Sequence, residues 1–428
     1  MDKIKIRKKN KILKGEIQLP FSKSESNRLL IIKSLCYDEF SIKNLSDADD
    51  TVLLKKNLEK IKTYCKPDIP KIIDTKNAGT VMRFLTAFLS NNSGKWILTG
   101  SERMKERPVG VLVNALRQLG AKIEYTDKEA YPPLKISGTK PEGGEISVDA
   151  SISSQYISAL LMIAPVLPQG LTLKLQGPIS SMTYIKMTME IMRFFGIKIS
   201  DNKNIIKIKN QQYIARDFSV EADWSAASYW YEMAAFSDEV DLTLKGLKIN
   251  SLQGDAVIAD IFKKFGVKTK FIPEGIHLSK TGKFVKKLYF DFNNYPDIAL
   301  AVIVSCAGLN INGNFKGLKN LKIKETDRIS ALKTELKKTG CNFEETSESG
   351  WELKNISRIH KPSSLQFSTH NDHRMAMSFA PLALKYGEIE IENPGVVKKS
   401  YPGFWNDLKT IGFKICCIDF DADPCGQV

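Results

Sequence analysis

A run of alternating charges occupies residues 323–329, with the sequence Ile-Lys-Glu-Thr-Asp-Arg-Ile. Side chains four positions apart share a face of a helix, so Lys324 and Arg328 could point the same way. Read alone, such a run is typical of an exposed helical turn held by ion pairs with Glu325 and Asp327. The alternative is that the two cations face a common ligand, and the rest of the chain favours this alternative.

Arginines stand near the start of apolar runs that are expected to form buried helices. These are Arg28 in SNRLLIIKSL, Arg83 in TVMRFLTAFL and Arg374 in DHRMAMSFAPLAL. The positive end of a helix dipole disfavours cations, whereas helix N-termini attract anions. An unfavourable charge repeated at equivalent places therefore predicts bound anions, and multiply charged, phosphorylated small molecules are the expected ligands.

Other polar residues at these helix starts have a second interpretation. Ser153, Asp223 and Asp372 each precede an apolar run. Ser and Asp are also favoured N-caps, because their side chains accept hydrogen bonds from the first free backbone N–H groups. For these residues, capping and ligand binding both remain open.

Two basic loops strengthen the expectation of anionic ligands. Residues 101–110, SERMKERPVG, carry Arg103, Lys105 and Arg107, and residues 396–404, VVKKSYPGF, carry Lys398 and Lys399. Either loop alone could simply be solvated. The chain contains no GxxxxGK[ST] motif and no GxGxxG after a strand, so neither a P-loop nor a dinucleotide site is predicted.

A repeat organises these elements. A basic helix end, a glycine and a short strand recur about every seventy residues as LRQLGAKI, MRFFGIKI, FKKFGVKT, LKKTGCNF and LKTIGFKI. A glycine just past a helix is a C-cap signal. The segment LEKIKTYCK (58–66) looks like a degraded first copy that lacks the glycine.

A second series has a similar period. Six nearly all-apolar runs predict buried helices: SNRLLIIKSL, TVMRFLTAFL, SSQYISALLMIAPVL, DWSAASYWYEMAAF, PDIALAVIVSCAG and DHRMAMSFAPLAL. Strand-like alternation lies between the two series. We therefore predict an α/β protein of about six units, three in each of two domains.

Composition sets broad limits. A chain of 428 residues, 43% hydrophobic and 26% charged, predicts a globular protein with more than one core. Its formal charge of +15 favours anionic partners without choosing among them. No secretory signal and no apolar stretch of membrane-spanning length is evident, so no membrane association is predicted.

Metal and disulfide chemistry are not expected. The seven cysteines form no CxxC pair, which predicts reduced thiols in a cytoplasmic protein. His370 and His373 flank Asp372, but the chain contains only four histidines, so no metal site is predicted. No basic stripe is interleaved with aromatic residues, so nucleic-acid binding is supported by net charge alone.

Nine motifs occur in one order along the chain: LPFSKSESNR, NAGTVMR, RMKERP, SSQY, EADWSAASY, YPD, LKIKETDRI, NDHRMAM and KKSYP. Together they resemble the 5-enolpyruvylshikimate-3-phosphate synthase family, over residues 19–404. The resemblance implies two similar domains, each of three repeated α/β units with buried parallel helices, an inside-out α/β barrel. The expected domains are 1–20 with 224–428, and 21–223.

The resemblance also implies a reaction. The family transfers the enolpyruvyl group of phosphoenolpyruvate to the 5-hydroxyl of shikimate 3-phosphate and releases phosphate, without a metal or an organic cofactor. Asp297 would remove the proton of the hydroxyl and Glu325 would protonate the methylene carbon, with Lys23 as a further catalytic residue. A carboxylate among cations should be a weak base, so its alignment with the hydroxyl must matter more than its basicity.

The resemblance places ligands residue by residue. Shikimate 3-phosphate would contact Lys23, Ser24, Arg28, Ser153, Ser154, Gln155, Ser181, Tyr184, Asp297, Asn320 and Lys324. Phosphoenolpyruvate would contact Lys23, Asn77, the Gly79 backbone, Arg107, Gln155, Arg328, Arg374 and Lys399. The family inhibitor glyphosate would occupy the phosphoenolpyruvate site.

The sequence departs from the family pattern at a few positions. Phe21 stands where a small residue usually precedes the SKS motif, and Lys76 stands where glycine usually precedes NAGT. Met182 and Thr183 replace the more usual Lys-Pro. Phe21 could alter domain closure, and Lys76 would add charge near the phosphoenolpyruvate pocket.

Two alternative functions remain. UDP-N-acetylglucosamine enolpyruvyl transferases share the fold and the donor, but they commonly carry a loop cysteine, and this chain has none between Cys65 and Cys306. The second alternative is a basic nucleic-acid-binding protein. We expect a monomeric cytoplasmic enzyme that acts on small molecules.

Overall fold

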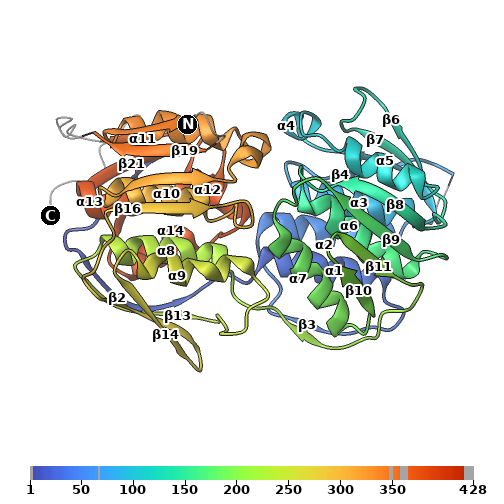
Figure 1. Ribbon diagram of the computed structural model, residues 1–428, viewed down its shortest axis with the longest axis horizontal. Helices are drawn as coiled ribbons and strands as arrows, with labels where there is room; N and C mark the ends of the chain where they lie inside the picture. Colours follow the sequence, from blue (N-terminus) through green and yellow to red (C-terminus); the bar gives the residue numbers. More distant parts are fainter. Residues whose placement is uncertain (1–2, 66–67, 347–349, 357–364, 419–428) are drawn as a thin grey trace. The chain divides into compact units, whose positions relative to one another are not determined.

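The computed structural model describes residues 3–65, 68–346, 350–356 and 365–418. The chain forms two compact units: unit 1 consists of Met1–Phe21 with Glu221–Val428, and unit 2 of Ser22–Val220. Figure 1 shows the elements of both units in sequence colours.

Unit 2 is built from short strands and buried helices. Its strands are β3 (Ile42–Lys43), β4 (Lys71–Asp74), β5 (Gly94–Thr99), β6 (Lys122–Tyr125), β7 (Leu134–Gly138), β8 (Gly144–Asp149), β9 (Leu171–Gln176), β10 (Ile199–Asn202), β11 (Ile205–Ile208) and β12 (Phe218–Ser219). Its α-helices are α1 (Lys23–Leu35), α2 (Asp49–Lys62), α3 (Gly79–Ser90), α4 (Glu102–Lys105), α5 (Gly110–Gln118), α6 (Ser154–Ile163) and α7 (Met182–Phe194).

Unit 1 repeats this construction. Its strands are β1 (Lys3–Arg7), β2 (Ile12–Gln18), β13 (Glu239–Lys245), β14 (Val267–Ile272), β15 (Gly275–Lys280), β16 (Lys287–Asp291), β17 (Asn312–Lys316), β18 (Cys341–Glu345), β19 (Trp351–Asn355), β20 (Leu365–Phe367), β21 (Glu388–Glu392) and β22 (Lys414–Ile418). Its α-helices are α8 (Trp224–Phe236), α9 (Ile258–Lys263), α10 (Ala299–Gly308), α11 (Arg328–Lys337), α12 (His373–Phe379), α13 (Ala383–Tyr386) and α14 (Phe404–Thr410). Short 3₁₀ helices include η2 (Gly254–Val257), η3 (Lys319–Ile323) and η5 (Pro394–Lys399).

The four-stranded sheets of the described chain share one pairing pattern. Their orders are β4-β5-β7-β6, β8-β9-β11-β10, β2-β13-β15-β14, β16-β17-β19-β18 and β20-β21-β1-β22. In each, the first two strands are parallel and the next two pairings are antiparallel. The repeat predicted from the sequence is therefore a repeat of structure.

The first copy in unit 2 differs. Only β3 and β12 pair there, as a two-stranded parallel ladder. This copy contains α1 and α2, and α2 covers most of the segment LEKIKTYCK in which the glycine signal is missing. The loss of the C-cap glycine thus coincides with the loss of the antiparallel strands that follow it in the other copies.

The repeated glycines end their helices as predicted. Gly120, Gly196, Gly266, Gly340 and Gly412 all have positive φ, between 75° and 100°. Each backbone N–H donates to the carbonyl three residues earlier, within the last helical turn. Glycine enters this left-handed conformation without the steric cost that a Cβ would impose, so the local sequence determines where these helices stop.

The predicted buried helices form the cores. In unit 1, α10 packs against α8 and α12, and these helices lie side by side in Figure 1. In unit 2, α3 packs against α6, and α6 against α7. Every residue of α10 is buried, and nearly every residue of α3 and α8 is buried. The helix starts therefore hold polar side chains at the edges of apolar cores.

Among the described residues, no helix combines the length and the apolar character that crossing a bilayer requires.

Candidate active site

In unit 1, Arg328 is the centre of an ion-pair network. Its guanidinium is 1% exposed, and its Nε lies 2.7 Å from Asp372 Oδ2. Its Nη2 lies 3.0 Å from Glu325 Oε2, and its Nη1 lies 3.6 Å from Asp297 Oδ1. Burial alone would lower the pKa of Arg328, but the charges of Asp372 and Glu325 raise it above the ordinary value.

Further cations extend the network at both carboxylates. Arg374 Nη2 lies 3.2 Å from Asp297 Oδ2, and its Nη1 donates to the Asp297 carbonyl at 2.8 Å. Lys399 Nζ lies 3.1 Å from Glu325 Oε1. Asp297 is therefore flanked by Arg328 and Arg374, and Glu325 bridges Arg328 and Lys399. These are the two carboxylates to which the resemblance gives proton transfer.

The charged residues of the segment 323–329 do not lie on one helix. Lys324 follows η3 in an extended conformation, and α11 begins only at Arg328. Asp327 is the N-cap of α11, and its Oδ1 accepts hydrogen bonds from the N–H groups of Ile329 and Ser330. An N-cap residue has non-helical backbone angles, so the prediction that Lys324 and Arg328 share a helical face was wrong.

The capping interpretation is confirmed where it was left open. Ser153, Asp223 and Asp372 accept hydrogen bonds from the first turns of α6, α8 and α12 respectively. Asp372 also binds Arg328, so capping leaves its other contacts available. The sequence did not indicate this second role, because Asp372 and Arg328 are 44 residues apart.

The two remaining predicted residues of unit 1 lie just before this network. Asn320 belongs to η3, Lys324 follows it directly, and both are partly buried. The histidines near Asp372 have carboxylate neighbours: His370 Nε2 lies 2.9 Å from Glu335 Oε1, and His373 Nδ1 lies 3.5 Å from Asp372 Oδ1. The described residues contain no group of three or more His, Cys, Asp or Glu side chains arranged to hold a metal ion.

In unit 2, Arg28 is held by neutral oxygen atoms. Its guanidinium donates to Thr188 Oγ1 at 2.7 Å, to Ser158 Oγ at 3.2 Å, and to the carbonyls of Ser24 and Tyr184. Burial lowers the pKa of Arg28 to about 10, while the charges of Tyr184 and Glu25 act in the opposite direction. Of the residues predicted to bind shikimate 3-phosphate, Ser24, Arg28 and Tyr184 are thus brought together.

A second cationic group lies at the start of α3. Arg107 donates to the Asn77 carbonyl at 3.4 Å, and Arg83 donates to the carbonyls of Gly79 and Pro108. A Cβ at Gly79 would lie 2.7 Å from Arg107 Nη2 and 2.9 Å from Arg83 Nη1. Asn77, Gly79 and Arg107 therefore meet, as the resemblance implied, and Arg83 lies beside them although it was not among the predicted ligands.

The other predicted residues of unit 2 lie at the starts of α1, α6 and α7. Gln155 donates to Thr80 Oγ1 at 3.1 Å, which ties α6 to the first turn of α3. Ser154 is buried in the first turn of α6. Ser181 precedes α7 with a positive φ of 57°. Lys23, the first residue of α1, lies 3.2 Å from Asp50.

Lys76 illustrates how the chain accommodates a departure from the family pattern. Its φ is +49°, a conformation that glycine adopts without strain. Asp74 supports the turn: its Oδ1 accepts the Lys76 N–H at 2.7 Å, and its Oδ2 lies 2.7 Å from Lys76 Nζ. The added charge is therefore largely exposed and paired with Asp74.

The other departures lie at element ends. Phe21 forms an isolated antiparallel bridge with Ala222 inside unit 1. Met182 and Thr183 are the first residues of α7.

Residues 7–408 match the family described as EPSP synthase (3-phosphoshikimate 1-carboxyvinyltransferase). The chain belongs to the EPSP synthase family. It is 48% identical over 406 residues to a 3-phosphoshikimate 1-carboxyvinyltransferase of Bacteroides fragilis (strain YCH46), covering 94% of this chain and 96% of that protein.

More distant relatives agree. A 3-phosphoshikimate 1-carboxyvinyltransferase of Vibrio atlanticus (strain LGP32) is 36% identical over 418 residues, covering 93% of this chain and 96% of that protein. Among solved structures, EPSP synthase from Acinetobacter baumannii superimposes with a TM-score of 0.76 over 98% of this chain and 100% of that chain. At 22% identity this likeness establishes the fold, which confirms the predicted two-domain enolpyruvyl transferase architecture of the EPSP synthase family.

Proposed function

We propose that the carboxylate network of unit 1 and the arginine sites of unit 2 supply the chemistry of the EPSP synthase family. The chain is an enolpyruvyl transferase of the shikimate pathway: the enolpyruvyl group of phosphoenolpyruvate passes to the 5-hydroxyl of shikimate 3-phosphate, and phosphate is released. The family match favours neither a UDP-N-acetylglucosamine enolpyruvyl transferase nor a nucleic-acid-binding protein.

The observation that carries the assignment of roles is the pairing of each carboxylate with two cations. Asp297 contacts Arg328 and Arg374, and Glu325 contacts Arg328 and Lys399. The carboxylate and phosphate groups of phosphoenolpyruvate would compete with Asp297 and Glu325 for these cations, because the guanidinium group of arginine binds both carboxylates and phosphates well. Binding of the donor would thereby release Asp297 and Glu325 from part of their ion pairing.

In the addition step, Asp297 accepts the proton of the 5-hydroxyl as that oxygen attacks the central carbon of phosphoenolpyruvate. Glu325 gives a proton to the methylene carbon, which becomes a methyl group in a tetrahedral intermediate. In the elimination step, the methyl group returns one proton to Glu325, the C–O bond to phosphate breaks, the leaving phosphate takes the proton held by Asp297, and the enol ether forms. Both carboxyl groups thus regain their starting protonation states.

In unit 2, the proposed roles are binding roles. Arg28 with Ser24 and Tyr184, and Ser153, Ser154 and Ser181, hold shikimate 3-phosphate. Arg107, with the backbone at Asn77 and Gly79, holds phosphoenolpyruvate. Lys23 and Gln155 contact both ligands, and on the unit 1 side Asn320 and Lys324 contact the shikimate. Support comes from two groups of contacts: Arg28 donates to the carbonyls of Ser24 and Tyr184, and Arg107 donates to the Asn77 carbonyl.

Phosphate release with both substrates tests the proposed function. We expect turnover only when shikimate 3-phosphate and phosphoenolpyruvate are both present. Omission of either substrate, or replacement of shikimate 3-phosphate by UDP-N-acetylglucosamine, should abolish it. Turnover with UDP-N-acetylglucosamine and none with shikimate 3-phosphate would contradict the assignment.

We further propose a monomer that works in the cytoplasm, with small molecules and no nucleic acid as partners. The cysteines of the described residues are all free thiols, which suits a reducing compartment. Light scattering at increasing concentration should give a constant mass near 48.1 kDa. A mass that doubles with concentration would exclude the monomer.

A further inference from the structure

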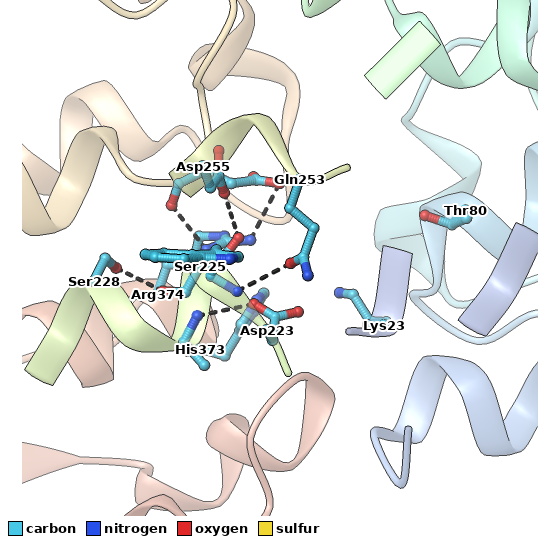
Figure 2. Close-up of polar contacts among 12 residues, drawn as sticks. Lys23, Thr80, Asp223, Ser225, Ser228, Gln253, Asp255, His373 and Arg374 are labelled. Carbon is cyan, nitrogen blue, oxygen red and sulfur yellow. Dashed lines mark hydrogen bonds and ion pairs between the residues drawn. The ribbon is translucent and has the colours of Figure 1, made fainter. Parts of the chain in front are cut away.

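A segment that the sequence analysis did not single out, Ser251–Asp255, is fastened to the start of α8. Gln253 Oε1 accepts the N–H of Trp224 at 3.0 Å, and Gln253 Nε2 donates to the Ala222 carbonyl at 2.8 Å. Ser251 Oγ donates to Glu221 Oε2 at 2.6 Å. Because these contacts fix Ser251 and Gln253, the last residue of the segment has a defined position (Figure 2).

That residue, Asp255, is a buried carboxyl group with one hydrogen-bond partner. It is 3% exposed, and Ser225 Oγ donates to its Oδ2 at 2.5 Å. Its Oδ1 is buried and has no hydrogen-bond partner among the described residues. Figure 2 shows Asp255 and Ser225 beside Arg374.

Arg374 connects Asp255 to the proposed base, because it lies beside Asp255 (Figure 2) and its Nη2 lies 3.2 Å from Asp297 Oδ2. The charges of Asp297 and Asp223 disfavour the ionisation of Asp255, and that of Arg374 favours it. Burial, followed by the charge of Asp297, raises the pKa of Asp255 to about 7, while the hydrogen bond from Ser225 lowers it. Asp255 and Asp297 are thus two interacting carboxyl groups, and Arg374 acts on both.

This interaction bears on the weakness of Asp297 as a base. Two arginines within 4 Å stabilise its ionised form and so reduce its affinity for a proton. A second carboxylate nearby has the opposite effect, because an ionised neighbour favours protonation. Of the groups that act on Asp255, Asp297 is the one with a proposed role in proton transfer. Asp297 also contacts both Arg328 and Arg374.

We propose that Asp255 is a positioning residue that, when ionised, keeps Asp297 basic enough to take the proton of the attacking hydroxyl. The assignment rests on the proposed function. It adds a fourth carboxyl group to the unit 1 network, beside Asp297, Glu325 and Asp372.

The test is the pH profile of kcat at saturating substrates for the wild type and for Asp255→Asn, which keeps the shape of the side chain and removes its charge. The wild-type kcat should rise through pH 7 as Asp255 ionises. Asp255→Asn should lack this rise, and at the alkaline plateau its kcat should be lower on the order of 10-fold, a part of the full general-base contribution. Titration of the substrate phosphates affects all variants alike.

Ser225→Ala provides a second variant that keeps the carboxyl group. Loss of the Ser225 hydrogen bond should move the rise to higher pH without abolishing it. Asp260→Asn, an exposed carboxyl group on α9, is the matched control and should leave the profile unchanged.

The outcomes are distinguishable. A pH profile of Asp255→Asn with the same shape as the wild-type profile overturns the inference, as does a Ser225→Ala profile that is not displaced. Absence of wild-type turnover with the two substrates would overturn the proposed function and this inference with it. An infrared band of a protonated carboxyl group that titrates near pH 7 and is missing in Asp255→Asn would support the inference independently of activity.

Discussion

Arg28 in unit 2 and Arg328 in unit 1 are buried almost equally, at 3% and 1% exposure, but their surroundings differ. Arg328 contacts three carboxylates, whereas Arg28 donates to two hydroxyls and two carbonyls. Accordingly, the pKa of Arg28 falls to about 10 because of burial, while nearby carboxylates raise that of Arg328 despite burial.

The difference indicates two kinds of site. A buried cation whose hydrogen bonds go to neutral oxygens is less neutralised than one paired with carboxylates, and an anion that reaches it gains a strong interaction. A cation among carboxylates is already neutralised, so an anion must displace a carboxylate to bind. The first arrangement suits permanent binding of a phosphate, and the second suits carboxylates whose proton affinity must change during a reaction.

The largest effect that this comparison predicts is at Asp297. Asp297→Asn keeps the shape of the side chain and removes the proposed base. Loss of general base catalysis costs on the order of 100- to 10,000-fold, so kcat should fall by that factor. Calorimetry of shikimate 3-phosphate binding should show little change. A variant with nearly full activity would remove Asp297 from the proton-transfer role.

Arg107→Ala should affect binding instead. It removes a charge-assisted partner worth roughly 1.5–3 kcal/mol, which corresponds to an increase in the KM for phosphoenolpyruvate of about 10- to 150-fold. Binding of shikimate 3-phosphate alone should change little. Arg103→Ala, at a partly exposed arginine of the same loop that pairs with Glu106, is the matched control and should leave both constants unchanged. Loss of shikimate 3-phosphate binding alone would reverse the assignment.

Gly79→Ala should act on the same site more weakly. A Cβ there would meet the ends of the Arg107 and Arg83 side chains below 3.0 Å, and these flexible groups can shift. We expect a cost of about 1 kcal/mol, or roughly a fivefold rise in the KM for phosphoenolpyruvate, together with weaker inhibition by glyphosate. Gly395→Ala, which would meet no atom within 4 Å, is the control. Unchanged inhibition in Gly79→Ala would show that Gly79 does not line this pocket.

A further prediction concerns stability and a carboxyl group outside the network. Glu232 in α8 is fully buried, and neither oxygen has a hydrogen-bond partner among the described residues. Burial raises its pKa well above 4.5, so the native state holds a proton that the unfolded state loses. Stability should therefore decrease as pH rises above about 4.5 toward the raised native pKa.

Glu232→Leu should remove this dependence. Thermal unfolding near pH 5 and near pH 8 should show a larger gain for the variant at the higher pH, on the order of 1–3 kcal/mol. Glu59→Leu, at an exposed position of α2, is the control for added apolar surface. An equal gain at both pH values would mean that Glu232 is not a buried neutral acid.

Local signals in the sequence predicted much of the fold. The helix-ending glycines and the apolar helical runs depend on neighbouring residues, and the structure confirms both. The cap at Asp327 is also local, but it was overlooked, and the charged run was wrongly placed on one helix.

Contacts between distant residues could not be predicted in this way. Asp372 and Arg328 meet across 44 residues, and Ser225 and Asp255 across 30. Residue types along one chain do not specify such pairs, because they form only when separate repeats pack together. The family resemblance supplied the predicted ligands, but it did not include Asp255, Asp372 or Arg83.

The division between binding and proton transfer is tested most directly by the plateau of turnover at saturating phosphoenolpyruvate in Asp297→Asn and in Arg107→Ala. The account predicts that excess phosphoenolpyruvate brings Arg107→Ala close to the wild-type plateau, while Asp297→Asn remains at least about 100-fold below it. Equal plateaus for the two variants, or a lower plateau for Arg107→Ala, would contradict the account.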